Sequence, residues 1–327
     1  MKRVRWSVYI AGAAVGLAAL TACGADTSSD GSAGDWPGNK PIRYIVPYSP
    51  GGAVDVSSRL IVDCLADEVG GRWVVDNLTG AAGVEAMNKI INATPDGHTF
   101  GTVSHSMAVA TPLLVAKDAG YTYEDFGWIG QIALYPSLLL VQSDSPYKTM
   151  EDLIDAAKAK PGSISVATSG AQSSFHLALG QIADEYGVKL TGVPFPGDAD
   201  AIAALLGGQV DARFSGLNPD ALKYIESGDF RPLATGATGA VPDVIKDVPT
   251  LESLGFTDLI STDTTFAVAG PKGLSDEVTK KLTAATEKCV GSDEYKNVMK
   301  FQAKFGDSDE VLAFMKKYDA NLQRLVK

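Results

Sequence analysis

Beyond Pro41, short runs of apolar and β-branched residues alternate with stretches in which apolar residues recur every three or four positions. Runs of the first kind predict strands, and stretches of the second kind predict amphipathic helices. Strands that alternate with helices along a chain are typical of sheets covered by helices on their faces. The expected fold class is therefore α/β, with two domains built from mostly parallel sheets flanked by helices.

The predicted elements follow one another without an internal repeat of solenoid length. The expected strands are 42–47, 73–77, 99–104, 128–133, 137–142, 164–167, 190–195, 210–214, 231–235 and 264–269. The expected helices are 55–69, 83–92, 149–160, 173–186, 198–207, 218–227, 275–290, 292–301 and 308–326. We expect one domain from 40–103 and 236–290, and a second from 104–235 and 291–327 with the C-terminal helices. The chain would cross between them near Ser104 and Thr235, and a cleft between two such domains favours a small ligand.

The first 23 residues have the pattern of a bacterial lipoprotein signal. Three basic residues precede an apolar run from Val8 to Leu20, which is too short for a stop-transfer helix. Cys23 follows Leu-Thr-Ala directly, a position in which its thiol can take a diacylglycerol before cleavage. We expect residues 1–22 to be removed and the lipid on Cys23 to hold the chain at the outer face of the cell membrane. A membrane anchor helix and a plain secretory signal are the alternatives.

The stretch after Cys23 and the charge balance limit the partners. Residues 24–35 contain no large apolar side chain, so 23–39 is expected to be a flexible tether. The full sequence has a net charge of −11, and loss of the basic signal would make the remainder more acidic still. Nucleic acid is disfavoured as a partner because phosphate binding needs a basic surface. We expect a monomer.

Cysteine and histidine usage gives no sign of a metal site. Cys64 and Cys289 each lie in an amphipathic pattern, and the sequence leaves open whether they form a disulfide or remain separate buried thiols. The three histidines are scattered, at positions 98, 105 and 176, and no zinc spacing is present. We expect neither a metal nor a cofactor.

The first candidate site is the connection between the strand 42–47 and the helix 55–69. Adjacent glycines let a backbone approach a ligand closely, and a helix N-terminus favours an anion. No Walker or dinucleotide-binding motif is present there. The alternative is a tight turn in which Asp55 caps the helix. The candidate anion-binding residues of this first loop are Tyr48, Ser49, Gly51, Gly52 and Asp55.

A second loop repeats this arrangement in the other predicted domain, as a strand followed by a turn rich in hydroxyls and glycine and then by a helix. Two such loops facing one another would hold an anion from both sides. The alternative is a helix capped by Ser173 or Ser174, with His176 on the surface. A hydrolase is disfavoured because no Gly-x-Ser-x-Gly motif is present and residues this close at a helix start do not face each other. The candidate residues here are Thr168, Ser169, Gly170, Ser173, Ser174 and His176.

From about Lys40 to Lys327 the chain resembles the extracytoplasmic substrate receptors of tripartite tricarboxylate transporters, the Bug family. The similarity is carried by many short stretches in the same order. They are 41–43, 46–48, Gly51 and Gly52 with Asp55 and Arg59, 75–77, 80–83, 95–99, Gly170 with Ser173 and His176, 193–195 with Gly197, 206–211 and 248–250.

The resemblance implies a two-domain periplasmic binding protein of type II, a venus flytrap, and no enzyme activity. It implies that a ligand carboxylate is held between the two loops by main-chain N–H groups, hydroxyls and water, with Gly197 and Asp198 at the rim. The expected ligand is a di- or tricarboxylate or a similar organic acid. Domain closure on this ligand would then allow the receptor to deliver it to membrane subunits of the transporter.

Several positions depart from the family pattern. His98 stands where an aromatic Tyr or Phe is usual, and the aromatic residue usual near Asp263 and Thr264 is missing. Arg213 lies in a strand that is normally apolar, as either a cation for a second carboxylate or a strand-edge residue paired with a surface acid. Two other functions remain as alternatives. One is a ligand sensor for a two-component signalling system, and the other is a hydrolase that uses Ser173 or Ser174.

Overall fold

The computed structural model describes residues 36–51, 53–171, 173–195, 197–237, 241–256, 259 and 263–325. The predicted signal, most of the tether, Cys23, Gly52 and Pro196 lie outside the described residues. Among the residues that are described, no helix combines the length and the apolar character needed to cross a bilayer.

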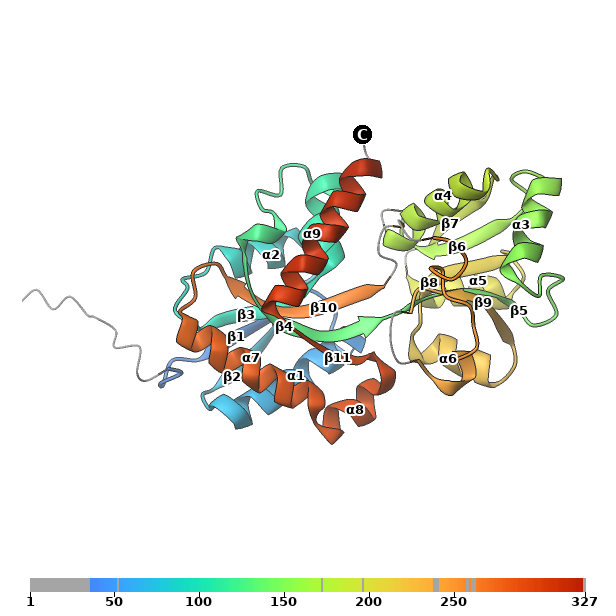
Figure 1. The fold of residues 1–327 in the computed structure, drawn as a ribbon. Helices are drawn as coiled ribbons and strands as arrows, with labels where there is room; N and C mark the ends of the chain where they lie inside the picture. Colours follow the sequence, from blue (N-terminus) through green and yellow to red (C-terminus); the bar gives the residue numbers. More distant parts are fainter. Residues whose placement is uncertain are drawn as a thin grey trace, which may run out of the picture. The chain divides into compact units, whose positions relative to one another are not determined.

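A six-stranded sheet carries the first loop (Figure 1). Its strand order is β11-β4-β10-β3-β1-β2, in which β1, β2 and β3 are parallel and β10 runs antiparallel to both β3 and β4. The strands are β1 Ile42–Val46, β2 Trp73–Asn77, β3 Thr99–Ser104, β4 Phe126–Tyr135, β10 Thr264–Pro271 and β11 Ala303–Asp307.

Helices cover both faces of this sheet because alternate strand residues are apolar on both sides. One face packs against α1 Ala53–Val69, α7 Asp276–Gly291 and α8 Asp293–Met299. The other packs against α2 Val84–Ile91, α9 Ser308–Leu325 and a π-helical segment, Ser106–Val115. Short 3-10 turns complete this part of the chain at Ala81–Gly83, Tyr123–Asp125 and Lys300–Gln302.

A disulfide joins Cys64 on α1 to Cys289 on α7, with Cα atoms 5.7 Å apart. The sequence had left this bond open. The two cysteines lie on neighbouring helices on the same face of the six-stranded sheet, which brings together residues 225 positions apart in the chain. The bond therefore ties α1 to α7, two of the helices that cover this face of the sheet.

The second sheet has five strands in the order β7-β6-β8-β5-β9. Its strands are β5 Ser137–Gln142, β6 Ser165–Ser169, β7 Thr191–Phe195, β8 Ala212–Gly216 and β9 Phe230–Thr235. The helices around it are α3 Met150–Ala159, α4 Ser174–Tyr186, α5 Asp198–Leu206 and α6 Pro219–Glu226, and a 3-10 turn follows at Asp243–Ile245. Side chains of Thr149, Ser173 and Asn218 cap the first turns of α3, α4 and α6.

The sheet pairing corrects the expected domain boundaries. Residues 104–135 and 291–327 were assigned to the second domain, but β4 and β11 pair within the six-stranded sheet. The chain passes from one sheet to the other at Pro136, between β4 and β5, and not near Ser104. The crossing expected after Thr235 is present, since the chain returns from β9 to β10.

The sheets are mixed, which corrects the expectation of mostly parallel sheets. Four strand pairs are parallel and five are antiparallel among the described residues, so neither orientation dominates. The antiparallel pairs all involve β4, β5, β10 or β11, the strands at and beside the two crossings. The first loop follows β1, which is parallel to β3, and the second loop follows β6, which is parallel to β8. Each candidate loop therefore lies at the edge of its sheet where these parallel strands end.

Candidate functional site

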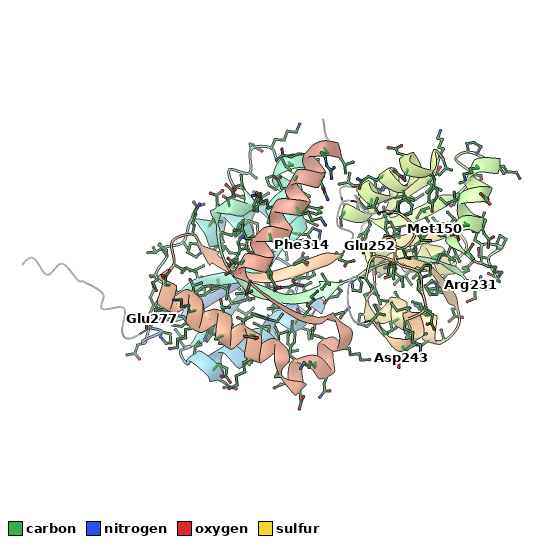
Figure 2. All side chains as sticks on the ribbon, in the orientation of Figure 1. Met150, Arg231, Asp243, Glu252, Glu277 and Phe314 are labelled. Atoms are coloured by element: carbon green, nitrogen blue, oxygen red, sulfur yellow. A yellow bond between two sulfur atoms is a disulfide. The ribbon has the colours of Figure 1, made fainter. Side chains whose placement is uncertain are left out.

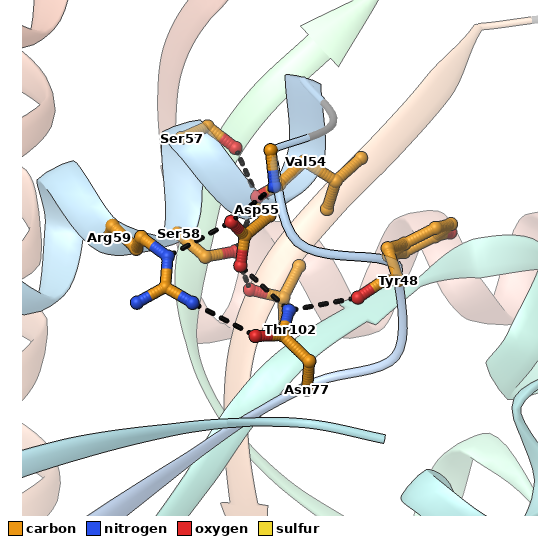
Figure 3. Close-up of polar contacts among 9 residues, drawn as sticks. Tyr48, Val54, Asp55, Ser57, Ser58, Arg59, Asn77 and Thr102 are labelled. Carbon is orange, nitrogen blue, oxygen red and sulfur yellow. Dashed lines mark hydrogen bonds and ion pairs between the residues drawn. The ribbon is translucent and has the colours of Figure 1, made fainter. Parts of the chain in front are cut away.

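The first loop is held by a buried carboxylate at the start of α1 (Figure 3). Asp55 accepts hydrogen bonds from the Gly51 amide at 2.9 Å, from Arg59 Nε at 2.9 Å and from Asn77 Nδ2 at 2.7 Å. Asn77 also donates to the Tyr48 carbonyl at 2.9 Å. The side chains of α1 and β2 thus fix both ends of the loop.

Asp55 therefore has a structural role, although not as the N-cap of the alternative interpretation. It is the third residue of α1 and it binds the loop amide of Gly51, which lies before the helix. Burial by itself would raise the pKa of Asp55, but the hydrogen bonds from Arg59, Asn77 and Gly51 outweigh it and lower the pKa to about 2. Because the Gly51 amide donates to this carboxylate, it is not free to bind an anion, contrary to expectation.

A second set of hydroxyls anchors α1 to the sheet below the loop. Ser58 Oγ donates to the Val54 carbonyl at 2.7 Å and lies 2.7 Å from Thr102 Oγ1 on β3. Thr102 Oγ1 lies in turn 2.9 Å from the hydroxyl of Tyr44 on β1. All three of these hydroxyl side chains are buried, so they join α1, β3 and β1 rather than face a ligand.

The exposed part of the first loop, among the described residues, consists of Ser49, Pro50 and Gly51, while Tyr48 is half-buried. The Tyr48 ring packs edge-on against Phe266 of β10, with ring centroids 5.9 Å apart. Phe266 also contacts Tyr135 at the end of β4, with centroids 5.4 Å apart. Burial raises the pKa of Tyr48 and raises that of Tyr135 to about 12, so both hydroxyls stay protonated.

The second loop is built around the end of β6 and the start of α4. Ser173 caps α4 by accepting from the His176 amide at 3.2 Å, and its hydroxyl donates to the Gly170 carbonyl at 2.8 Å. Gly170 has a φ of +97°, a conformation that glycine adopts at little cost. Ser169 Oγ lies 3.0 Å from Ser215 Oγ at the end of β8. This loop therefore meets the neighbouring strand through hydroxyl groups.

His176 is turned into its own sheet rather than onto the surface. Its Nδ1 lies 3.0 Å from the Oγ1 of Thr168, which is fully buried. A Cβ at Gly192 on β7 would come within 2.6 Å of the imidazole, so this position has no room for a larger residue while the ring is there. His176 and Thr168 join α4, β6 and β7, and the imidazole does not pair with Ser173, whose hydroxyl is engaged elsewhere.

The first turn of α4 has backbone N–H groups that make no hydrogen bond within the second loop. The amides of Gly170 and Ser173 donate within the loop, to the carbonyls of Thr168 and Gly170. The amides of Ser174 and Phe175, the first two residues of α4, donate to no partner among the described residues. They are the N–H groups that a helix leaves free for an anion.

Arg213 lies neither at the edge of a sheet nor on the surface, so its interpretation as a strand-edge residue was wrong. It lies on β8 between β6 and β5, and its side chain is fully buried. Its guanidinium donates to the Asp198 carboxylate at the start of α5 and to the Gly216 carbonyl at 3.1 Å. Asn218, the N-cap of α6, also donates to Asp198. Asp198 thus ties α5 to β8 and α6, while Gly197 is the N-cap of α5 without a side-chain bond.

Aromatic residues near the crossing lie beside each of the two loops. Tyr48 of the first loop contacts Phe266, and Phe266 contacts Tyr135. A Cβ added to Gly216 would lie 3.8 Å from Tyr135 and 3.6 Å from Phe175, the second residue of α4. No direct bond between the loops is present among the described residues. Nor is either loop part of the pockets described for this chain.

A family model described as the tripartite tricarboxylate transporter family receptor matches residues 57–326. The chain belongs to this receptor family. The match begins just after the first loop and includes the whole of the second. The family consists of solute-binding receptors rather than a class of enzyme, and its members work outside the cytoplasm.

Two curated relatives support the assignment. The receptor is 31% identical to the UPF0065 protein in the gbd 5' region of Cupriavidus necator over 292 residues, which cover 89% of this chain and 85% of the relative. It is 30% identical to the protein BugT of Bordetella pertussis over 240 residues, which cover 73% of each chain. The resemblance to the Bug family noted from the sequence is thereby confirmed.

Two solved structures share the fold. A TctC solute-binding protein from Polaromonas, without ligand, has a TM-score of 0.78 at 27% identity and covers 89% of this chain and 99% of its own. The R. palustris protein Rpa4515, in complex with adipate, has a TM-score of 0.73 at 27% identity and covers 89% of this chain and 97% of its own. These matches confirm the two-domain fold of the solute-binding type.

The positions that depart from the family pattern have structural roles in the receptor. His98 lies beside β3, with its ring nitrogens 2.9 Å from the Asp96 carbonyl and 3.1 Å from the Pro37 carbonyl. Asp263, beside the missing aromatic residue, is buried and accepts from the Ser137 amide at 3.2 Å. Asn77, Tyr135 and Ser215 also shape the site, and none of the three was expected from the sequence to contact a ligand. Their neighbours in the fold are far away in sequence, so only an expected sheet order would have found them.

Proposed function

We propose that the receptor binds a small di- or tricarboxylate between the first and second loops and delivers it to the membrane subunits of a tripartite tricarboxylate-type transporter. It acts outside the cytoplasm as a monomer, held at the outer face of the cell membrane by lipid on Cys23. Closure of the two sheets around the ligand is the step that prepares it for docking.

The observation that carries this proposal is the likeness to Rpa4515, a protein of the same fold at 27% identity that is described with adipate. Adipate has a carboxylate at each end of a flexible apolar chain, so one ligand can present a charged group to each of two opposed loops. The family assignment adds the transport role.

The polar groups around the second loop suit a carboxylate. The free amides of Ser174 and Phe175 begin a helix of 13 residues, whose N-terminus favours negative charge. On the opposite loop, Ser49 is exposed and offers a side-chain donor, whereas Asp55 holds the Gly51 amide and the Tyr48 hydroxyl faces Ser104. Gly52 and Asp198 belong to the proposed site as its loop backbone and its rim.

The disulfide supports the proposed location. Such bonds persist in oxidising compartments outside the cytoplasm and are rare inside it. A lipid on Cys23, joined by residues 24–35, would leave the folded part free to reach a membrane partner.

The direct test places a charge in the proposed site. Ser49→Asp adds a negative group to the exposed part of the first loop, and we expect it to weaken adipate binding at least about tenfold by calorimetry. Ser163→Asp is the matched control, because Ser163 is an exposed serine that precedes β6 at the opposite edge of the second sheet. Equal adipate affinity in the two variants and the unmodified receptor would remove the first loop from the site.

A further inference from the structure

A pocket of about 330 Å³ lies behind the crossings between the two sheets and is separate from both loops. Its walls include Gln131 and Leu134 of β4, Gly236 after β9 and Thr265 of β10. Phe314 of α9 and Glu252, from the segment between β9 and β10, close its sides (Figure 2). Pockets of this size accept a small organic solute.

The inner wall of this pocket carries a polar group that the fold does not satisfy. The hydroxyl of Thr265 is buried and has no hydrogen-bond partner among the described residues, whereas the buried Tyr318 hydroxyl faces the side chain of Ser106. Thr265 is held in place by its own amide, which donates to His105 Nδ1 at 3.2 Å. Buried hydroxyls without partners are uncommon, and an unfilled ligand position is one explanation. The Thr265 hydroxyl is therefore available to a bound molecule.

Asp263 is the charged group of this inner wall. Its side chain is buried and accepts from the Ser137 amide, but no cation pairs with it within 4 Å among the described residues. Burial raises the pKa of Asp263 to about 7, with Lys304 acting on it only over a longer distance. A carboxylate in this position is stabilised by any ammonium group that enters the pocket.

The rim of the pocket has the opposite charge. Lys304 of β11 and Lys317 of α9 are exposed lining residues and form no ion pair within the described part of the chain, and Glu252 is the acidic residue beside them. A molecule whose ammonium group reaches Asp263 can therefore direct a carboxylate to the two lysines. The hydroxyls of Thr265 and Tyr318 lie along the same wall.

We propose that this pocket is a second solute site, which binds a small zwitterion of the amino-acid class with its ammonium group on Asp263. The site is distinct from the proposed carboxylate site, because its residues come from β4, from the segment between β9 and β10, and from β10, β11 and α9, and none comes from the two loops. The proposal does not depend on the identity of the ligand between the loops.

The test is calorimetry of the full-length chain with each of the standard L-amino acids, in the presence of excess adipate. For the tightest binder, the matching 2-hydroxy acid removes the ammonium group and the matching amide removes the carboxylate. We expect at least one amino acid to bind, and both analogues to bind at least about tenfold more weakly.

Variants locate the binding. Asp263→Asn keeps an acceptor for the Ser137 amide but loses the charge, and we expect it to weaken binding at least about tenfold, with Thr265→Val giving a smaller loss. Asp211→Asn is the matched control, since Asp211 also accepts a backbone amide, from Ser165 at 2.8 Å, but lies outside the pocket. Ser49→Asp should leave amino-acid binding unchanged.

Three results would overturn the second site. They are no binding of any amino acid at about 10 mM, binding that survives both Asp263→Asn and Thr265→Val, and binding that Ser49→Asp abolishes. The last would mean that the amino acid occupies the loops. Loss of adipate binding without any change in amino-acid binding would instead count against the proposed function alone.

Discussion

Two carboxylate–guanidinium contacts, one beside each sheet, bury opposite partners. At the first loop the Asp55 side chain is 3% exposed, and its partner Arg59 is 45% exposed. Beside the second sheet the Arg213 side chain is fully buried, and its partner Asp198 is 25% exposed. The first contact therefore protects a negative charge and the second protects a positive one.

The two buried charges also differ in how well they are satisfied. The Asp55 carboxylate accepts three hydrogen bonds, from Gly51, Arg59 and Asn77. Arg213 leaves its Nε and Nη1 without a partner among the described residues. A buried ion is tolerated in proportion to the bonds that compensate its loss of water. We infer that the first network tolerates the loss of one partner and that Arg213 depends on Asp198.

The largest effect is expected at this second contact. Asp198→Ala leaves a buried guanidinium without its counter-ion, and we expect a loss of about 3–5 kcal/mol in the free energy of unfolding, measured with denaturant. Replacing both partners, Asp198→Ala with Arg213→Met, should recover most of this loss because no buried charge remains. A double variant as unstable as the single one would show that Arg213 is not the cause.

The disulfide tests whether the six-stranded sheet owes its stability to the bond. Replacing Cys64 and Cys289 by alanine should lower the free energy of unfolding by about 2–4 kcal/mol, because the bond closes a long loop. Hydrogen exchange should increase first in α1 and α7, with the five-stranded sheet unchanged. Equal loosening of both sheets would contradict this assignment.

Asp55 is expected to make the stability of the receptor depend on pH in the acid range. A carboxyl whose pKa is lowered on folding adds stability above its unfolded pKa, and this is lost as the pH falls from about 4 to about 2. Asp55→Ala should lower the free energy of unfolding by about 2 kcal/mol at neutral pH. It should also make this free energy less dependent on pH across this range. Asp63→Ala, at an exposed site on the same helix, is the control, and it should leave the loss of stability at acid pH unchanged.

The smallest effect is expected for Arg59. This arginine is half exposed and Asp55 keeps two other donors, so Arg59→Ala should cost less than about 1 kcal/mol. The pKa of Asp55, followed by NMR, should rise. A loss as large as that of Asp198→Ala would remove the contrast between the two contacts.

The sequence predicted local structure well where the pattern was local. The expected ranges of β2, β3 and β5 match the structure, and Ser173 caps α4, as one interpretation of the second loop expected. β11 was missed because Ala303–Asp307 has little apolar alternation, and it becomes a strand by pairing with β4. The segment Ser106–Val115 was missed because its apolar residues follow no single period around Pro112.

Long-range relations could not be predicted in this way. β4 was given to the wrong domain because its sheet is decided by β10, a strand more than a hundred residues further along the chain. The two loops were located correctly between strands and helices, but the partner of the Gly51 amide depends on side-chain geometry, and so does the orientation of His176. Whether the loops enclose one ligand stays a prediction.

Calorimetry with adipate and its neutral analogue adipamide tests the central claim most directly. The two molecules have the same carbon chain and differ in charge, so any preference reports on the carboxylates. The account predicts that the receptor binds adipate and that adipamide binds at least about a hundredfold more weakly. Equal binding of the two, or binding of adipamide alone, would contradict a carboxylate site.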